Sequence, residues 1–194
     1  IRALAKEKEI PVIAFAEDVA ASGGYWLACS ADEIYADESS VIGSIGVISA
    51  GFGFQGAIKK LGVERRVRAA GKMKSTLDPF LPEKPEDVDR LMKLQQDVHK
   101  TFTNMVRERR KDKLKVAEKE LFTGAFWTGR RALDLGLIDG IGNADQILRK
   151  KFGDQVIIKK FEKSKGWLAK KLSSSEDHTD KIISILEERS IWQR

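Results

Sequence analysis

The stretch Pro11–Cys29, PVIAFAEDVAASGGYWLAC, sets one serine between two alanines and two glycines. Its apolar start predicts a short buried strand, and the apolar residues after Gly23 predict a helix that begins directly after Ser22. The first backbone N–H groups of a helix have no helical partners, so the N–H of Gly23 can receive a developing oxyanion. Glycine also lets a substrate backbone approach closely. The junction therefore makes Ser22 a candidate nucleophile.

A second interpretation of Ser22 stays open, because serine is also a common helix cap. A cap does not require two glycines after it. The hydrolase elbow G-x-S-x-G matches AASGG apart from Ala20, but that fold needs an acid and then a histidine later in the chain. Only His178 lies late enough, which argues against an α/β-hydrolase.

The composition describes one ordinary globular domain of 194 residues, 42% hydrophobic and 33% charged. No apolar run is long enough for a membrane helix and no signal-peptide pattern opens the chain, so we expect the chain itself to be soluble. The net charge of +6 supports general attraction to anionic surfaces and does not point to nucleic acid. The single cysteine, Cys29, lies in an apolar stretch and is expected to pack in the core. The chain opens without Met in the last turns of a predicted helix, so we expect it to be a piece of a longer protein.

Helical and extended patterns alternate along the chain, which predicts an α/β domain. After Ser22, short extended pieces are expected to about residue 50, then a helix over residues 54–62 and an alternating strand over residues 63–70. A Pro-rich loop follows. From Glu86 to about Arg110, apolar residues recur every three or four positions, which predicts a long amphipathic helix. The recurring residues are Val88, Leu91, Leu94, Val98, Phe102 and Val106.

A nucleophilic serine needs a base, and the chain has only two histidines, His99 and His178. Neither lies near a candidate acidic partner, so we expect both on the surface. The alternative base is a lysine whose pKa is lowered by burial from about 10.4 toward neutrality. The stretch Ala69–Phe80, AAGKMKSTLDPF, places Lys72 and Lys74 in small and apolar company, so the base is expected to be one of these two.

Other motifs give weaker signals. GFGFQG, residues 51–56, matches the dinucleotide pattern G-x-G-x-x-G, but no acid ends the next predicted strand to hold a ribose, so we expect no nucleotide cofactor. No clustered His or Cys spacing suggests a metal. The basic segment of residues 159–172, KKFEKSKGWLAKKL, is typical either of a helix at a lipid headgroup layer or of a solvated terminal helix.

Three separated blocks carry a resemblance to a known family. They are VAASGGYWLACSADEIYADESSVIGSIGVI (residues 19–48), AAGKMKSTLDPF (residues 69–80) and FTGAFWTGRRALDLGLID (residues 122–139). Together they resemble the signal peptide peptidase A family, the membrane-associated Ser-Lys peptidases also known as protease IV, with their SohB relatives. The resemblance covers roughly residues 1–152 and is specific, because the blocks agree in order and spacing.

This resemblance implies an α/β fold, the ClpP/crotonase spiral of β-β-α units, in a peptidase domain of residues 1–160 with a basic, polar tail at 161–194. It implies Ser22 as nucleophile, Gly23 as oxyanion donor, Lys74 as general base and Ser44 of IGSIGV as the hydroxyl that orients the lysine. Only the family's spacing from Gly71 favours Lys74 over Lys72. No cofactor or metal is implied.

The resemblance also implies partners. Family members form rings in which site groups can come from neighbouring subunits, and the long helix would suit such docking. They act at the membrane on cleaved signal peptides and other exposed chains. The family's upstream Gly-Gly motif, which supplies a second oxyanion donor, and its membrane anchor are absent from this sequence. A crotonase-type acyl-CoA enzyme and a catalytically silent, membrane-associated assembly module are the alternatives.

Overall fold

The computed structural model describes residues 1–71 and 73–161. The chain divides into a compact unit from Ile1 to Asp154 and a second unit from Gln155 to Arg194. In the second unit the described residues 155–161 form no helix or strand. Lys72, His178 and most of the basic segment predicted from the sequence lie outside the described residues.

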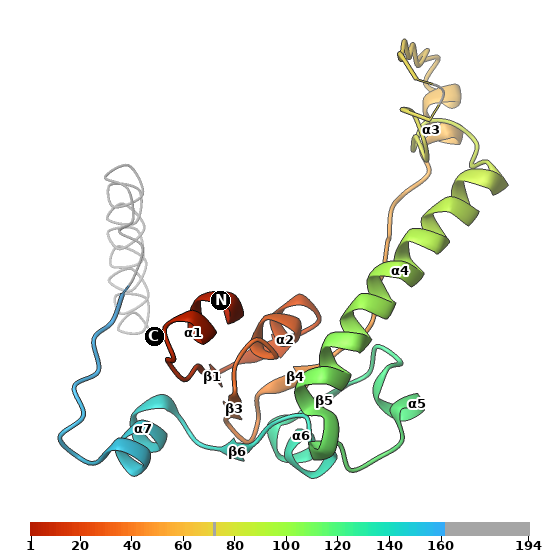
Figure 1. Ribbon diagram of the computed structural model, residues 1–194. Helices are drawn as coiled ribbons and strands as arrows, with labels where there is room; N and C mark the ends of the chain where they lie inside the picture. Colours follow the sequence, from red (N-terminus) through yellow and green to blue (C-terminus); the bar gives the residue numbers. More distant parts are fainter. Residues whose placement is uncertain (72, 162–194) are drawn as a thin grey trace, which may run out of the picture. The chain divides into compact units, whose positions relative to one another are not determined.

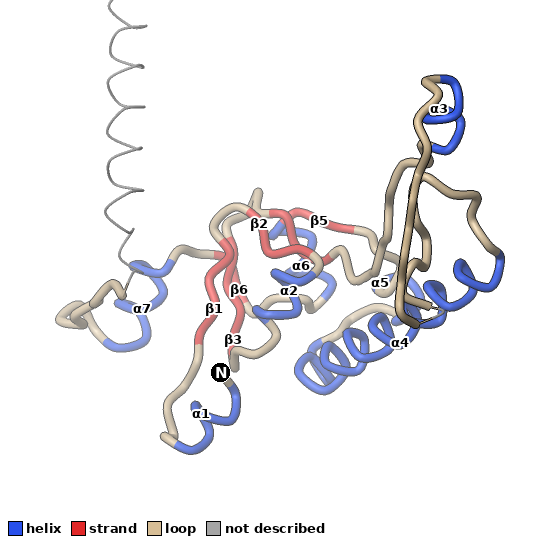
Figure 2. The backbone as a smooth tube through the Cα atoms, turned by 90° about the horizontal axis from the view of Figure 1, so that it is seen from above, coloured by secondary structure: helices blue, strands red, loops and turns tan. Residues whose placement is uncertain are grey.

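Two three-stranded sheets form the centre of the first unit (Figure 2). The first has the order β1 (Ile13–Ala16), β3 (Glu33–Ala36), β6 (Gly140–Ile141), and all its pairs are parallel. The second has the order β2 (Val19–Ala21), β4 (Val41–Gly43), β5 (Phe126–Thr128), with β2 and β4 parallel and β4 and β5 antiparallel. Parallel pairs need crossover connections, and the helix between β2 and β3 supplies one of them. The mixed α/β fold is thereby confirmed.

The helices connect and cover these sheets (Figure 1). Most agree with the sequence pattern within a few residues, including the long one. They are α1 (Arg2–Glu7), α2 (Gly23–Ala28), α3 (Gln55–Lys60), α4 (Pro85–Arg110), α5 (Glu118–Leu121), α6 (Gly129–Leu135) and α7 (Ala144–Phe152), with a 3₁₀ turn at Lys111–Lys113. In the described part of the chain, none of them combines the length and apolar character that a membrane span requires.

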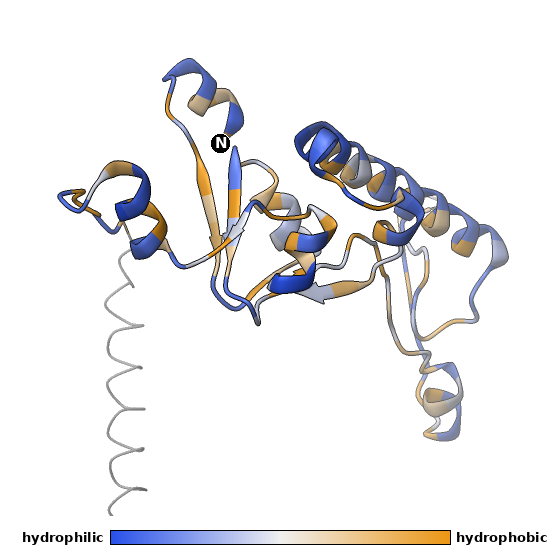
Figure 3. Ribbon diagram, turned by 90° about the horizontal axis from the view of Figure 1, so that it is seen from below, coloured by the Kyte–Doolittle hydropathy of each residue, from blue (hydrophilic) through white to orange (hydrophobic). Residues whose placement is uncertain are grey.

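The core lies where α2, α6 and the C-terminal half of α4 meet the strands. Trp26 of α2 stacks on Phe102 of α4 with ring centroids 4.7 Å apart. The buried Tyr25 hydroxyl donates a 2.7 Å hydrogen bond to the backbone oxygen of Leu137, just after α6. In Figure 3, β1 is coloured largely as apolar, in agreement with a strand that packs on the core, and α4 largely as hydrophilic with apolar patches, in agreement with an amphipathic helix. This packing fixes α2, and with it the residue that begins the helix.

The predicted strand over residues 63–70 is wrong. Residues 63–69 have no regular structure, and every residue from 61 to 71 is exposed. An alternating pattern forms a strand only when another strand pairs with it, and none does among the described residues. The chain between β4 and α4 instead extends away from the sheets (Figures 1 and 2). It leaves large apolar side chains in water, among them Ile48 (87% exposed) and Phe52 (80%).

Candidate active site

Ser22 lies on the surface directly before α2, with an unusual backbone conformation. Its φ of 51° and ψ of −122° match the first central position of a type II′ turn, where glycine is the usual residue. The Ser22 N–H donates to the Gly43 oxygen at 2.8 Å, and its own carbonyl accepts the first helical bond from Trp26 at 2.9 Å. Within the described chain its side chain makes no capping hydrogen bond. The hydroxyl is thus exposed and unused by the helix.

Ser44 lies beside Ser22 at the same end of two parallel strands. In the register of β2 and β4, Ala21 pairs with Gly43, so Ser22 and Ser44 are the next residues along each strand. Ser44 also has a positive φ of 51°, and its N–H donates to the Ala125 oxygen at 2.7 Å. The fold therefore brings together two serines that are far apart in the sequence.

Gly23 and Gly24 open α2 and face unoccupied space. A Cβ added to either glycine would meet no described heavy atom within 4 Å, and neither has a positive φ. Neither the backbone conformation nor packing within the described chain therefore requires glycine here. The first N–H groups of the helix point out of its N-terminus without helical acceptors. The arrangement can receive an oxyanion at Gly23 and admit a second backbone close to Ser22.

Lys74 is not brought to this cluster within the single chain. It is exposed in a turn after Gly71, whose oxygen accepts the Lys74 N–H at 3.1 Å. The segment between α3 and α4 that carries it lies near the N-terminal end of α4, whereas β2 and β4 lie near the other end (Figures 1 and 2). Of the four residues expected from the sequence, the chain assembles Ser22, Gly23 and Ser44 and leaves Lys74 apart.

Comparison with known proteins identifies the family. The model of peptidase family S49 matches residues 4–155. The chain belongs to peptidase family S49. S49 is a serine-type peptidase family with a ClpP/crotonase-like fold, which confirms both the resemblance and the fold class expected from the sequence.

Individual relatives of this S49 chain carry different names. It is 50% identical over its whole length to the Na(+)/H(+) antiporter NhaA of Brucella abortus, of which it covers 28%. It is 30% identical over 94% of its length to a protein of Enterococcus faecium assigned as signal peptide peptidase SppA, of which it covers 56%. A crystal structure of an enoyl-CoA hydratase/isomerase family member matches 77% of the chain and 40% of its own, with 18% identity and a TM-score of 0.36. The chain thus spans only part of the length of these relatives.

Two further residues of the S49 chain can be compared with the expectations from the sequence, and one of the two differs. Cys29 is fully buried, as expected, and burial raises the pKa of its thiol to about 11, so it is no candidate nucleophile. His99 is not a solvated surface residue. It is half-buried, and its Nε2 lies 3.2 Å from the backbone oxygen of Ile45, the residue after Ser44.

The sequence did not predict the inward position of His99, because Leu94 and Val98 were assigned to the apolar, inward face of the helix. Leu94 is 60% exposed, and the helix instead turns Gln95 and His99 toward the rest of the chain. Residues three or four positions apart share one face of a helix, and this spacing joins Gln95, His99, Phe102 and Val106. Counting back from the buried Phe102 and Val106 would therefore have predicted that His99 points inward.

Proposed function

We propose that the chain forms the catalytic part of a serine endopeptidase in which Ser22 is the nucleophile and Lys74 the general base. The observation that carries the proposal is the state of Ser22. It holds a conformation that side chains rarely adopt, its exposed hydroxyl caps nothing in the described chain, and the helix N-terminus beside it faces open space. Strained residues of this kind concentrate at functional sites.

In the proposed reaction the Oγ of Ser22 attacks the carbonyl carbon of the scissile peptide bond while its proton passes to the neutral amine of Lys74. The negative oxygen that forms is held by the N–H of Gly23. The C–N bond then breaks, and the leaving amine takes the proton from Lys74. Lys74 then takes a proton from water as the water oxygen attacks the acyl carbon. The bond from this carbon to the Oγ of Ser22 breaks, Oγ takes the proton back from Lys74, and the acid product leaves as its carboxylate.

Lys74 can accept a proton only as a neutral amine, which requires its removal from water. In the single chain Lys74 is exposed, and the segment between α3 and α4 that carries it lies away from α2, the helix that begins after Ser22 (Figure 1). We therefore propose that a neighbouring copy in a homo-oligomer provides both the burial and the proximity, with Ser44 orienting the amine by a hydrogen bond. The exposed apolar residues between β4 and α4, such as Ile48 and Phe52, support a contact between copies.

The proposed substrates are signal-peptide remnants or other polypeptides close to a membrane. The similarity to a protein assigned as a signal peptide peptidase supports this class. The net charge of +6 is compatible with an anionic membrane surface as a further partner of the whole protein, which we propose to be membrane-associated.

The proposal is tested by covalent labelling of the full-length protein with a fluorophosphonate probe, followed by intact mass measurement. Wild type is compared with Ser22→Ala, Lys74→Ala and Lys72→Ala. We expect one adduct on wild type, none on Ser22→Ala, and a rate reduced at least 10²-fold for Lys74→Ala, because the loss of a general base typically costs 10²–10⁴.

Lys72→Ala is the matched control, since it removes a lysine two residues away and should label at the wild-type rate. Loss of labelling in Lys72→Ala with labelling retained in Lys74→Ala would move the base to Lys72. A folded, assembled wild type that takes no label would contradict the proposal and favour a catalytically silent assembly module, with Ser22 only a helix-start residue.

A further inference from the structure

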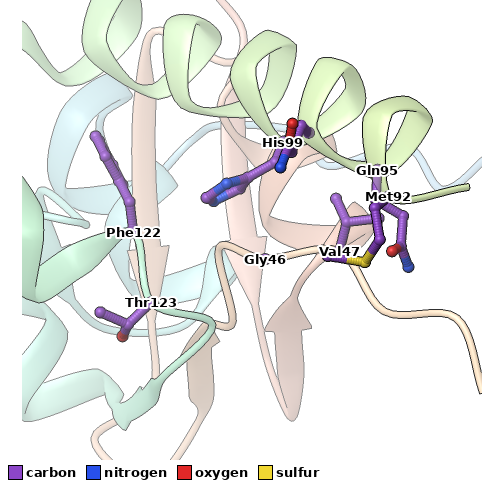
Figure 4. A pocket seen from close by; sticks show the side chains of 8 residues that line it. Gly46, Val47, Met92, Gln95, His99, Phe122 and Thr123 are labelled. Carbon is purple, nitrogen blue, oxygen red and sulfur yellow. The ribbon is translucent and has the colours of Figure 1, made fainter. Parts of the chain in front are cut away.

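The backbone oxygen of Ile45 receives two hydrogen bonds from distant parts of the chain. The Gly124 N–H donates to it at 3.2 Å, and Nε2 of His99 lies 3.2 Å from it. Figure 4 shows the His99 ring projecting from α4 toward the chain at Gly46, with Phe122 to one side and Met92 and Val47 to the other. Ile45 is the residue directly after Ser44, so this oxygen belongs to the serine-bearing segment.

The segment 43–46 continues the antiparallel pairing of β4 with β5 beyond the strand itself. Ser44 donates to the Ala125 oxygen at 2.7 Å, and Gly124 returns a bond to Ile45. A Cβ on Gly46 would come within 2.9 Å of the Gly124 Cα, so the two backbones pass very closely. The pairing with the chain at Gly124 and the side chain of His99 from α4 therefore both hold the Ile45 carbonyl.

These hydrogen bonds lie next to a strained turn. Gly43 has a φ of 105° and Ser44 a φ of 51°. A non-glycine residue with positive φ persists only when surrounding contacts over-determine it. Without His99 the Ile45 oxygen would keep only the hydrogen bond from Gly124. The Ser44 backbone would then be held less firmly and be freer to relax toward a negative φ, which would redirect its hydroxyl.

We propose that His99 is a positioning residue of the peptidase site, which fixes the direction of the Ser44 hydroxyl by holding the Ile45 carbonyl. The inference rests on the proposed function, because it assigns His99 a role through the serine that orients Lys74. A carbonyl oxygen can only accept, so Nε2 of His99 carries the proton. The neutral Nε2–H tautomer and the protonated ring both donate from this atom.

The surroundings of His99 allow the effect of losing its hydrogen bond to be measured separately from the effect of losing its packing contacts. The ring borders an open pocket of about 230 Å³, whose other walls include Met92, Gln95, Gln96 and Thr123. No charged side chain lines this pocket in the described part of the chain. Because one side of the ring already faces open space, replacing it removes fewer packing contacts than replacing a core residue such as Phe102 would.

The test compares three variants of the full-length protein. His99→Leu removes the donor, His99→Gln keeps an N–H donor near the position of Nε2, and Gln96→Leu alters the same pocket without touching the Ile45 carbonyl. The measurements are the fluorophosphonate labelling rate, kcat and KM on a quenched fluorescent peptide with an apolar side chain before the scissile bond, and Tm.

We expect His99→Leu to lower kcat and the labelling rate about tenfold, the size of one positioning hydrogen bond, with KM changed less than twofold. His99→Gln should recover to within about threefold of wild type, and Gln96→Leu should match wild type. A merely structural role would lower Tm in His99→Leu and His99→Gln alike and leave kcat per folded molecule unchanged.

The inference is overturned if wild type labels and His99→Leu labels at the same rate, or if His99→Gln is as slow as His99→Leu at equal Tm. Failure of the proposed function is distinct from both results, since the wild type itself would then take no label.

Discussion

Ser22 combines local strain with exposure. A non-glycine residue in the turn conformation of Ser22 costs of order 1–3 kcal/mol. The hydrogen bonds of Ser22 to Gly43 and Trp26 hold the conformation, and α2 is itself fixed by the stacking of Trp26 on Phe102. The chain therefore maintains a strained serine where a glycine would rest without strain, which is expected if the hydroxyl has a function.

Replacing Ser22 by glycine should stabilise the protein. Relief of the strain exceeds the extra backbone entropy that glycine loses on folding, about 0.5–1 kcal/mol, so the free energy of unfolding should rise by about 1 kcal/mol. Ser22→Ala is the matched control, because it removes the hydroxyl and keeps the strain. Urea unfolding of the three proteins measures the difference. Equal stability of the glycine and alanine variants would show that any strain at residue 22 does not exceed this entropy cost of about 0.5–1 kcal/mol, which would contradict the prediction.

At the residue scale, the position of Ser22 and Gly23 at the start of a helix could be predicted from the sequence. Ser22 and Gly23 stand out because a turn of small residues separates an apolar strand from an apolar helix. These patterns depend only on residues close together in the sequence. The contact of His99 with Ile45 could not be predicted, since it joins residues 54 positions apart and depends on the rotation of α4 about its axis. That rotation is set by the packing of Phe102 and Val106.

At the element scale, the C-terminal end of α4 is anchored by an ion cluster. Arg110, 2% exposed, donates to Asp139 at 2.6 Å and to the Gly136 oxygen at 2.8 Å. Asp139 also pairs with Lys113 at 2.7 Å and accepts from the Ile34 N–H at 2.8 Å. These bonds join α4, the turn after α6 and β3, so they help to fix the helix that carries His99.

The ion cluster should make stability depend on pH. Burial alone would raise the pKa of the Asp139 carboxyl, but hydrogen bonds from Arg110, Lys113 and Ile34 lower it below its usual value of 3.8. Because the folded pKa is lower than the unfolded one, this contribution to stability is complete above pH 3.8 and is lost as the pH falls through the folded pKa. Asp139→Asn should therefore cost about 3 kcal/mol at pH 7 and progressively less in acid.

Denaturant unfolding of wild type and Asp139→Asn between pH 7 and pH 2.5 measures this difference. Asp134→Asn is the control, because Asp134 is exposed and lies 3.9 Å from its partner Arg131. A difference between wild type and Asp139→Asn that stays constant across the whole pH range would rule out the carboxylate charge as its source.

The elements themselves were predicted unevenly. The helix from Pro85 to Arg110 could be predicted because its apolar periodicity extends over a long stretch and a proline marks its start. The short α5 and β5 were missed, since four and three residues are too few to show a period. The segment over residues 63–70 has a strand-like alternation, but no strand pairs with it among the described residues. The presence or absence of a partner strand cannot be predicted from a local pattern.

At the scale of the whole molecule, the site that we propose is incomplete in one chain. Ser22 and Ser44 lie together, Lys74 lies apart on an exposed segment, and that segment presents large apolar side chains to water. A ring of copies with head-to-tail contacts would pair the serines of one copy with the lysine of the next. Membership of family S49 gives the class of chemistry, and the position of Lys74 gives the reason to look for it between copies.

The most direct measurement mixes two inactive variants of the full-length protein, Ser22→Ala and Lys74→Ala, and follows fluorophosphonate labelling by intact mass. In a randomly mixed ring roughly a quarter of the sites regain a serine and a lysine from different copies. We expect label on the Lys74→Ala subunits of the mixture, at roughly a quarter of the wild-type amount. Within the same labelling time we expect none on Ser22→Ala alone and, at a rate at least 10²-fold lower, almost none on Lys74→Ala alone. Mixed oligomers that form but take no label at any ratio would contradict a site shared between neighbouring copies.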